Sequence, residues 1–139
     1  MSEHDRIGLA REFVLKVASG GIDRAHFADD LTVWTTTTGL IDGADYLPRM
    51  DQASHLWSRP LVMTIDSIVA RYGCVVLTAR SEGELFTGDE YGNDYLFIIE
   101  FDDQGKIRHV REHYDADRLE RTFRPALRKW QALALPDSI

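Results

Sequence analysis

Apolar residues recur at two different spacings along this chain, and each spacing predicts a different kind of element. Helical spacing, with capping and glycine stop signals, predicts helices at residues 5–19, 23–28, 42–57 and 115–123, and Pro125 is suited to start one more. The third of these helices is expected to be interrupted near Pro48. Runs rich in β-branched and aromatic residues predict strands at 31–38, 61–72, 74–85, 95–101 and 106–115.

The order of these elements predicts the fold class. Helices gather before a series of strands in hairpin connection, and a helix follows, which indicates an α+β fold and not a doubly wound one. A curved sheet wrapped over the helices would leave a cone with a cavity at its wide end. At 139 residues the chain is expected to form a single domain spanning residues 1–139.

The last predicted hairpin carries a carboxylate in an unusual setting. Its return strand places Val110, Glu112 and Tyr114 on one face, and Ile107, His109, Arg111 and His113 on the other, because side chains on a strand alternate. If the Val110 face points inward, Glu112 is a carboxylate inside an apolar wall, an arrangement typical of a working site. If that face points to solvent, Glu112 is an ordinary surface charge. The pattern alone leaves both readings open.

A second pair of charged residues lies on the strand predicted at 74–85. Arg80 and Glu82 share a face, with Cα atoms ~7 Å apart. If this face and Glu112 line the same cavity, the three form an acid–base set in which the arginine holds one carboxylate ionised. The alternative is a surface ion pair of little energetic consequence.

Aromatic and polar residues on the other strands are candidates for the lining of a pocket. An indole or phenyl ring would stack on an apolar ligand, and a buried tyrosine or asparagine could donate to a developing oxyanion. Ordinary core packing explains them equally well. The candidates are Trp34, Thr36, Asn93, Tyr95, Phe97 and Tyr114, with His26 and Trp57 at the rim.

Composition and charge exclude several function classes. The net charge of −7 and the lack of a basic run interleaved with aromatics argue against nucleic acid as a partner. His109 and His113 would lie roughly 13 Å apart on a strand, too far to share a metal ion. Cys74 is the only cysteine and sits in an apolar run, as a core thiol does. We expect no metal and no organic cofactor.

The N-terminus lacks the profile of a signal peptide, and no apolar run approaches the ~20 residues that span a bilayer. A cytoplasmic protein that does not bind membranes is therefore expected.

Several segments of the chain resemble a known family. FADDLTVW, GADYL, VVLTARSE and above all GKIRHVREHYDADRL are similar to segments of the SnoaL-like, or ketosteroid-isomerase-like, group within the nuclear-transport-factor-2-like superfamily. The resemblance covers nearly the whole chain. It implies a cystatin-like α+β barrel, in which a strongly curved antiparallel or mixed sheet is closed by N-terminal helices and followed by a C-terminal helix. It also implies a homodimer.

Branches of this family suggest different roles for the same residues. LTARSE and VREHYD resemble strands of limonene-epoxide hydrolases, which implies Arg80 as a bridging cation between Glu82 and Glu112. This chain departs from that pattern on its first strand, where Trp34 and Thr36 stand in place of the water-holding tyrosine and asparagine. The phenazine-biosynthesis branch implies Glu112 as the catalytic glutamate, and the SnoaL-type polyketide cyclases imply Asp115 as a second candidate base.

These observations predict an enzyme that uses general acid–base catalysis, of the isomerisation or cyclisation type, on a small apolar molecule that contains a ring. Epoxide hydrolysis is one alternative. A non-catalytic domain that binds a small ligand, or that serves only for dimerisation, is the other.

Overall fold

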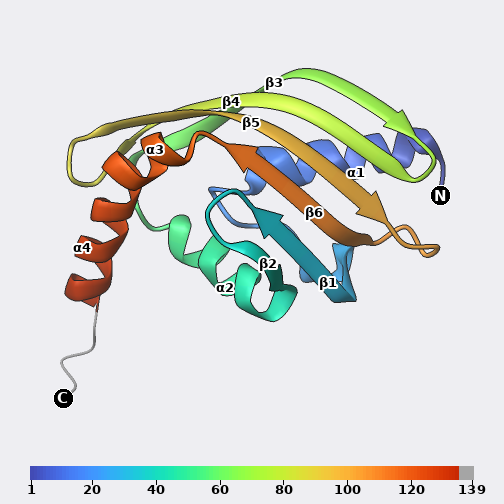
Figure 1. Cartoon of the computed structure of the whole chain (residues 1–139), viewed down its shortest axis with the longest axis horizontal. Helices are drawn as coiled ribbons and strands as arrows, with labels where there is room; N and C mark the ends of the chain where they lie inside the picture. The colour runs from blue at the N-terminus through green and yellow to red at the C-terminus, as the bar shows by residue number, and fades with distance from the viewer. Residues whose placement is uncertain (135–139) are drawn as a thin grey trace.

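The computed structural model describes residues 1–134, and its centre is one mixed sheet of six strands (Figure 1). The strands are β1 (Phe27–Thr35), β2 (Gly39–Asp42), β3 (Trp57–Arg71), β4 (Cys74–Leu85), β5 (Glu90–Phe101) and β6 (Ile107–Tyr114). They lie in the order β2-β1-β6-β5-β4-β3, and every neighbouring pair is antiparallel except β1 and β6, which are parallel. The predicted α+β class with a curved mixed sheet is confirmed.

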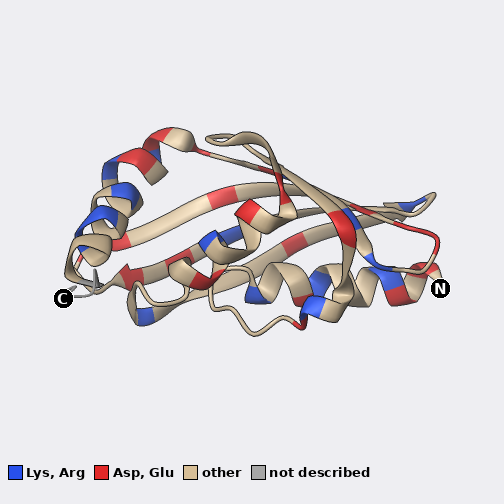
Figure 2. Ribbon diagram, turned by 90° about the horizontal axis from the view of Figure 1, so that it is seen from below, with Lys and Arg blue, Asp and Glu red and all other residues tan. Residues whose placement is uncertain are grey.

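Helices cover the concave side and the wide end of this sheet. They are α1 (Glu3–Lys16), the 3₁₀ turn η1 (Arg24–His26), α2 (Gly43–Ala53), α3 (Ala116–Arg118), the π-helical turn η2 (Leu119–Phe123) and α4 (Arg124–Ala134). In Figure 1, the long strands β3 to β5 arch over α1, and α4 descends at the opposite end from the N-terminus. Figure 2 shows acidic and basic segments interspersed along the ribbon, with several basic segments on the C-terminal helices. None of the helices within residues 1–134 combines the length and apolarity needed to cross a bilayer.

The core forms where α1 meets the inner face of the sheet. Ser2 caps α1 in a reciprocal capping box with Asp5, which fixes the start of the helix. The fully buried ring of Phe13 contacts Phe27 on β1 and Phe97 on β5, both edge to face. These contacts fill the inside of the sheet beside α1 with side chains, and a cavity lies toward the other end of the sheet.

A bulge in β6 corrects the predicted faces of the last hairpin. The pairing register shifts between Glu100 and Phe101 of β5, so that Phe101 faces Ile107 while Glu100 faces His109. Ile107 is therefore fully buried together with Val110, although simple alternation placed the two on opposite faces. The bulge leaves the register beyond Val110 intact, so the Glu112 face points inward.

Several element predictions need smaller corrections. The second predicted helix is only the 3₁₀ turn η1, and the chain enters β1 four residues earlier than predicted. The predicted strand at 31–38 ends at Thr35, because Thr36–Thr38 turn the chain into β2, a strand that was not predicted and where Gly39 has φ +66°. Pro48 lies within α2 without ending it. The C-terminal helix extends to Ala134, and residues 135–139 of the predicted single domain lie outside the described residues.

Candidate active site

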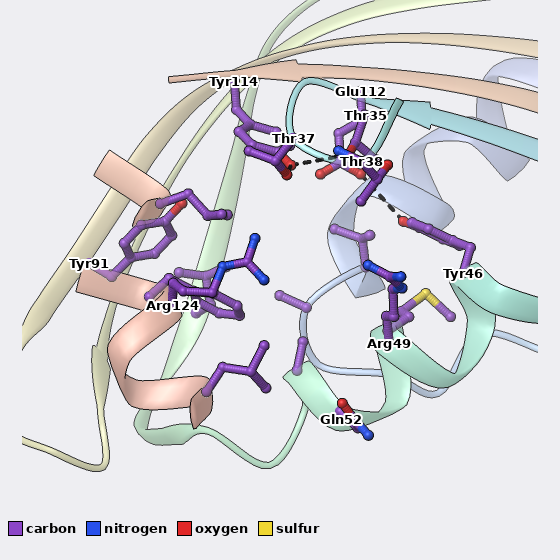
Figure 3. Close-up of a pocket in the computed structure, with 18 of the residues that line it drawn as sticks. Thr35, Thr37, Thr38, Tyr46, Arg49, Gln52, Tyr91, Glu112, Tyr114 and Arg124 are labelled. Atoms are coloured by element: carbon purple, nitrogen blue, oxygen red, sulfur yellow. Dashed lines mark hydrogen bonds between the residues drawn. The ribbon is translucent and has the colours of Figure 1, made fainter. Parts of the chain in front are cut away.

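A cavity of about 470 Å³ occupies the wide end of the cone (Figure 3). Its walls come from the inner face of β3, β5 and β6, the turn between β1 and β2, the end of α1, one side of α2, and the C-terminal helices η2 and α4. Most of the lining is aliphatic or aromatic. Such a mainly apolar pocket with a few polar groups suits a small organic ligand.

Glu112 contributes the only carboxylate to this lining within residues 1–134. It lies on β6 between Thr35 of β1 and Phe97 of β5, its partners in the ladder. The Tyr46 hydroxyl of α2 donates a hydrogen bond to Glu112 Oε1 over 3.3 Å. Burial raises the pKa of Glu112 to about 7, and the Tyr46 hydrogen bond offsets part of that rise. Both the ionised and the neutral forms are therefore accessible near neutral pH, as a group that accepts and returns a proton requires.

Hydroxyl groups gather beside this carboxylate. The Tyr114 hydroxyl donates to Thr35 Oγ1 over 3.2 Å and also hydrogen-bonds the Thr37 hydroxyl. Thr35 in turn bonds the Thr38 hydroxyl over 2.7 Å and accepts from the Thr38 backbone N–H over 3.1 Å. The turn that interrupts the predicted first strand is thus held by its own side chains. It brings rotatable donors and acceptors to the wall next to Glu112.

Three tyrosines of the cavity are suited to donate hydrogen bonds and not to lose protons. Burial raises the pKa of Tyr46 and Tyr95 well above the ordinary value and that of Tyr91 to about 12. The Tyr95 hydroxyl lies 2.9 Å from Ser81 Oγ, and Tyr91 accepts from the Asn93 amide over 2.8 Å. Glu112 is consequently the one lining group in this set whose ionisation changes near neutral pH.

The far end of the cavity is aromatic. Trp57 of β3, Tyr91 of β5 and Phe123 of η2 lie with ring centroids 5.5–6.2 Å apart in each pairing. Aromatic contacts at these separations are favourable, and the exposed ring surface beside them can accept a flat apolar ligand. The cavity therefore has a polar end at Glu112 and an apolar end at these three rings.

The predicted trio of Arg80, Glu82 and Glu112 is wrong. The inner face of β4 is formed by Val75, Leu77 and Ala79, which are buried, so Arg80 and Glu82 point to the outer face of the sheet. Arg80 there forms an ion pair with Asp66, Nε to Oδ1 3.3 Å, with a side chain 60% exposed. The alternation correctly placed Arg80 and Glu82 on one face but did not determine which face that is.

Trp34 and Thr36 also lie outside the cavity. Trp34 packs on the outer face of the sheet beneath the Arg111 guanidinium, 4.2 Å from the ring centre, and beside His113. Thr36 is exposed and accepts from the Tyr114 backbone N–H over 3.1 Å. Thr35, between them in the sequence, lines the cavity instead, because successive side chains on a strand point to opposite faces.

Three further candidates hold the structure together instead of lining the cavity. Asn93 is buried, and its amide bonds both the carbonyl and the N–H of Asp115, at 3.0 and 2.9 Å. Asp115 caps α3 by accepting from the N–H groups of Asp117 and Arg118. Phe97 is a fully buried core residue. The catalytic role considered for Asp115 has no support from its position.

Of the remaining candidates, three line the cavity and one does not. Tyr95, Tyr114 and Trp57 line the cavity as predicted, whereas His26 lies near Glu12 on another surface, with Nε2 and Oε2 3.7 Å apart. Tyr46 was not among the predicted site residues, and neither were Arg49 and Arg124, which line the mouth of the cavity. These three residues lie on helices, where no alternation signals which side will face a cavity; only the GADYL segment drew attention to the helix that carries Tyr46.

Neither any protein-family model nor any curated protein matches this sequence. Solved structures do match its fold. PrhC from Penicillium brasilianum aligns at TM-score 0.75 and 17% identity, over 95% of this chain and 93% of that one. An LEH-like epoxide hydrolase from M. tuberculosis aligns at TM-score 0.65 and 20% identity, over 96% and 98%.

SalBIII, an epoxide hydrolase/cyclase-like enzyme described with a role in pyran ring formation in the polyether salinomycin, aligns at TM-score 0.69 and 14% identity, over 84% of this chain and 95% of that one. Proteins named NTF2-like and SnoaL-like are among the further matches. At such low sequence identity, these matches show a shared fold and nothing more. That fold is the one implied by the resemblance of the sequence segments. The chain has the nuclear-transport-factor-2-like fold, in the form shared by SnoaL-like and epoxide-hydrolase-like proteins.

Proposed function

We propose that this protein is an enzyme that isomerises or cyclises a small, largely apolar, ring-containing molecule by general acid–base catalysis at Glu112. The observation that carries the proposal is a single carboxylate in a mainly apolar cavity, with a pKa near neutrality. A structural carboxylate would be expected to have a cationic partner, yet the hydrogen bond to Glu112 comes from the neutral Tyr46 hydroxyl.

The proposed reaction begins with the ionised form of Glu112. It takes a proton from a carbon next to a carbonyl group, and the carbonyl oxygen acquires the negative charge of an enolate. The Tyr95 and Tyr114 hydroxyls, which line the same cavity, are the proposed donors to this oxygen, and Tyr114 would give up its bond to Thr35 to donate there. In an isomerisation, the neutral Glu112 returns the proton to another carbon of the conjugated system. In a cyclisation, the enolate carbon attacks a second carbonyl and the proton goes to the new alkoxide.

Epoxide hydrolysis is the less well supported alternative. Its support is the fold shared with the LEH-like enzyme of M. tuberculosis. The acid–base set that the sequence resemblance implied for this reaction needs a second carboxylate and a bridging arginine beside Glu112. Glu82 and Arg80 lie on the outer face, so the described part of the cavity lacks that set.

The test is turnover by the Glu112→Gln variant, after a screen of enones, polyketide-like aromatics and epoxides. We expect kcat to fall by about 10²–10⁴-fold, the usual contribution of a positioned acid–base group, while ligand affinity is kept because glutamine has the same shape. In the native enzyme, kcat/KM should rise with pH through about 7 and then stay level, since Tyr46, Tyr91 and Tyr95 remain protonated.

Glu100→Gln is the matched control, because Glu100 lies on β5 and does not line the cavity. It should leave both kcat and the pH profile unchanged. Unchanged turnover in Glu112→Gln would remove this residue from the mechanism. Tight binding of a screened compound without any turnover would favour a non-catalytic ligand-binding domain.

A further inference from the structure

Two arginines face the cavity from opposite helices, and the proposed chemistry at Glu112 uses neither. Figure 3 shows the Arg49 guanidinium entering from α2 and that of Arg124 entering from the C-terminal helix on the other side. Both residues belong to the cavity lining. In a protein with a net charge of −7, the mouth of this cavity is therefore locally basic.

Arg49 has no acidic partner within 4.0 Å among residues 1–134. Asp45 lies one helical turn before it, in the position where an ion pair on the helix surface would be expected, but the two do not pair. All the N–H groups of this guanidinium are therefore available to a ligand.

Only one edge of the Arg124 guanidinium group is hydrogen-bonded within the described residues. Its Nε and Nη2 atoms donate to the two carboxylate oxygens of Glu120 over 3.3 and 3.1 Å, and its side chain is 29% exposed. The bidentate contact fixes the orientation of the planar group and occupies only part of its donors. The Nη1 donors remain without a partner in the described part of the chain, at the edge of the cavity.

Neither guanidinium lies within 4.0 Å of Glu112, whose pKa reflects burial and the Tyr46 hydrogen bond and no nearby cation. The basic mouth and the carboxylate are thus separate subsites of one cavity. An anion bound at the mouth would not need to share space with the ionised Glu112.

We propose that the ligand carries a carboxylate group, which Arg49 and Arg124 hold between them, while its ring lies against Trp57, Tyr91 and Phe123. This inference rests on the proposed function and narrows it to ring compounds with an acidic arm. Guanidinium groups recognise carboxylates through paired N–H donors, and two of them on facing helices would both select the charge and fix the orientation of the ring. The reactive carbon would then be directed to the Glu112 end.

The test measures binding of matched probes by calorimetry, with benzoate, cinnamate and naphthoate each compared with its neutral carboxamide. The native protein should prefer at least one carboxylate to its amide. Arg49→Gln and Arg124→Gln should each weaken binding of that carboxylate by roughly 10-fold or more, the usual effect of losing a charged hydrogen bond, and should change amide binding less than about 2-fold. Arg121→Gln is the matched control, because its side chain is 77% exposed and pairs with Asp117 outside the cavity.

Equal losses for carboxylate and amide in the arginine variants would overturn the inference, as would unchanged binding of both or no preference for any carboxylate in the native protein. Circular dichroism and thermal unfolding establish that the variants are folded, and Arg49→Lys and Arg124→Lys should restore part of the preference by restoring the charge. The Glu112→Gln variant separates the two proposals. If Glu112→Gln loses turnover but carboxylate binding does not depend on the arginines, the proposed function stands without the carboxylate site. If carboxylate binding depends on the arginines but Glu112→Gln keeps its turnover, only the carboxylate site stands.

Discussion

At the scale of single residues, Glu112 should make the stability of the protein depend on pH. Its pKa is about 7 in the folded protein and near 4.5 in an unfolded chain, so the folded state binds the proton more tightly. The resulting gain in the free energy of unfolding is fully present below about pH 4.5 and is lost as the pH rises through about 7. Above that range the buried charge lowers the free energy of unfolding.

Glu112→Gln should therefore stabilise the protein at about pH 8, by roughly 1–3 kcal/mol, and have little effect at about pH 4. Glutamine keeps an oxygen that can accept from Tyr46 but carries no charge at any pH. Urea unfolding of the native protein and the variant at both pH values measures the difference. A gain of equal size at both would show that the effect comes from packing and not from ionisation.

Some site residues could be predicted from the sequence and others could not, and the reason is geometric. Alternation on a strand correctly grouped Glu112 with Val110 and Tyr114, and Arg80 with Glu82. It could not assign either group to the inside, because β4 carries apolar residues on both faces, and on β6 the apolar Ile107 was grouped with the histidines while the charged Glu112 was grouped with Val110. Strand alternation could not identify Tyr46 as a site residue, since its contact with Glu112 joins a helix to a strand 66 residues away.

At the scale of elements, two glycines that look alike in the sequence should respond oppositely to substitution. A Cβ at Gly8, inside α1, would meet nothing within 4 Å, whereas one at Gly92 on β5 would lie 2.7 Å from the Ser81 carbonyl oxygen of β4. Gly8→Ala should raise the free energy of unfolding by about 0.5–1 kcal/mol through helix propensity. Gly92→Ala should lower it by roughly 1–3 kcal/mol, because two paired strands must separate.

Denaturant unfolding of these two variants provides the measurement, and each serves as the control for the other. Destabilisation by both would mean that α1 also needs a glycine for packing. Tolerance at Gly92 would mean that β4 and β5 can move apart there without loss of pairing.

The elements themselves were largely predictable where the local signal was strong. The strand at 74–85 coincides with β4, because a turn at Tyr72-Gly73 and a loop after Leu85 bound it on both sides. The end of the first strand at Thr35 was not predictable, since Thr36–Thr38 are as β-prone as the residues before them. Their turn depends on hydroxyl bonds to Thr35 and Tyr114, which exist only in the folded protein.

At the scale of the whole molecule, element order and family resemblance together predicted the cone but not how its wide end is closed. That closure depends on α4, which corresponds to the further helix expected to start at Pro125 and which packs chiefly on the turn before it. Its link to α2 and the segment that follows consists of few contacts. His55 stacks on Trp130 with ring centroids 5.7 Å apart, and Gln131 Nε2 lies 3.4 Å from Gln52 Oε1. A helix held in this way should open more readily than the sheet unfolds.

Removing the stack should therefore loosen the cavity without disturbing its chemistry. Trp130→Ala should weaken ligand binding by about 2–10-fold, as expected for an aromatic contact, and should speed hydrogen exchange in α4. The midpoint of the pH–rate profile should not move, since Trp130 does not contact Glu112 or Tyr46. Trp34→Ala removes an indole from the outer face of the sheet and is the matched control. Unchanged exchange in α4 would mean that the helix is anchored by its junction with η2, and that ligands enter the cavity by another route.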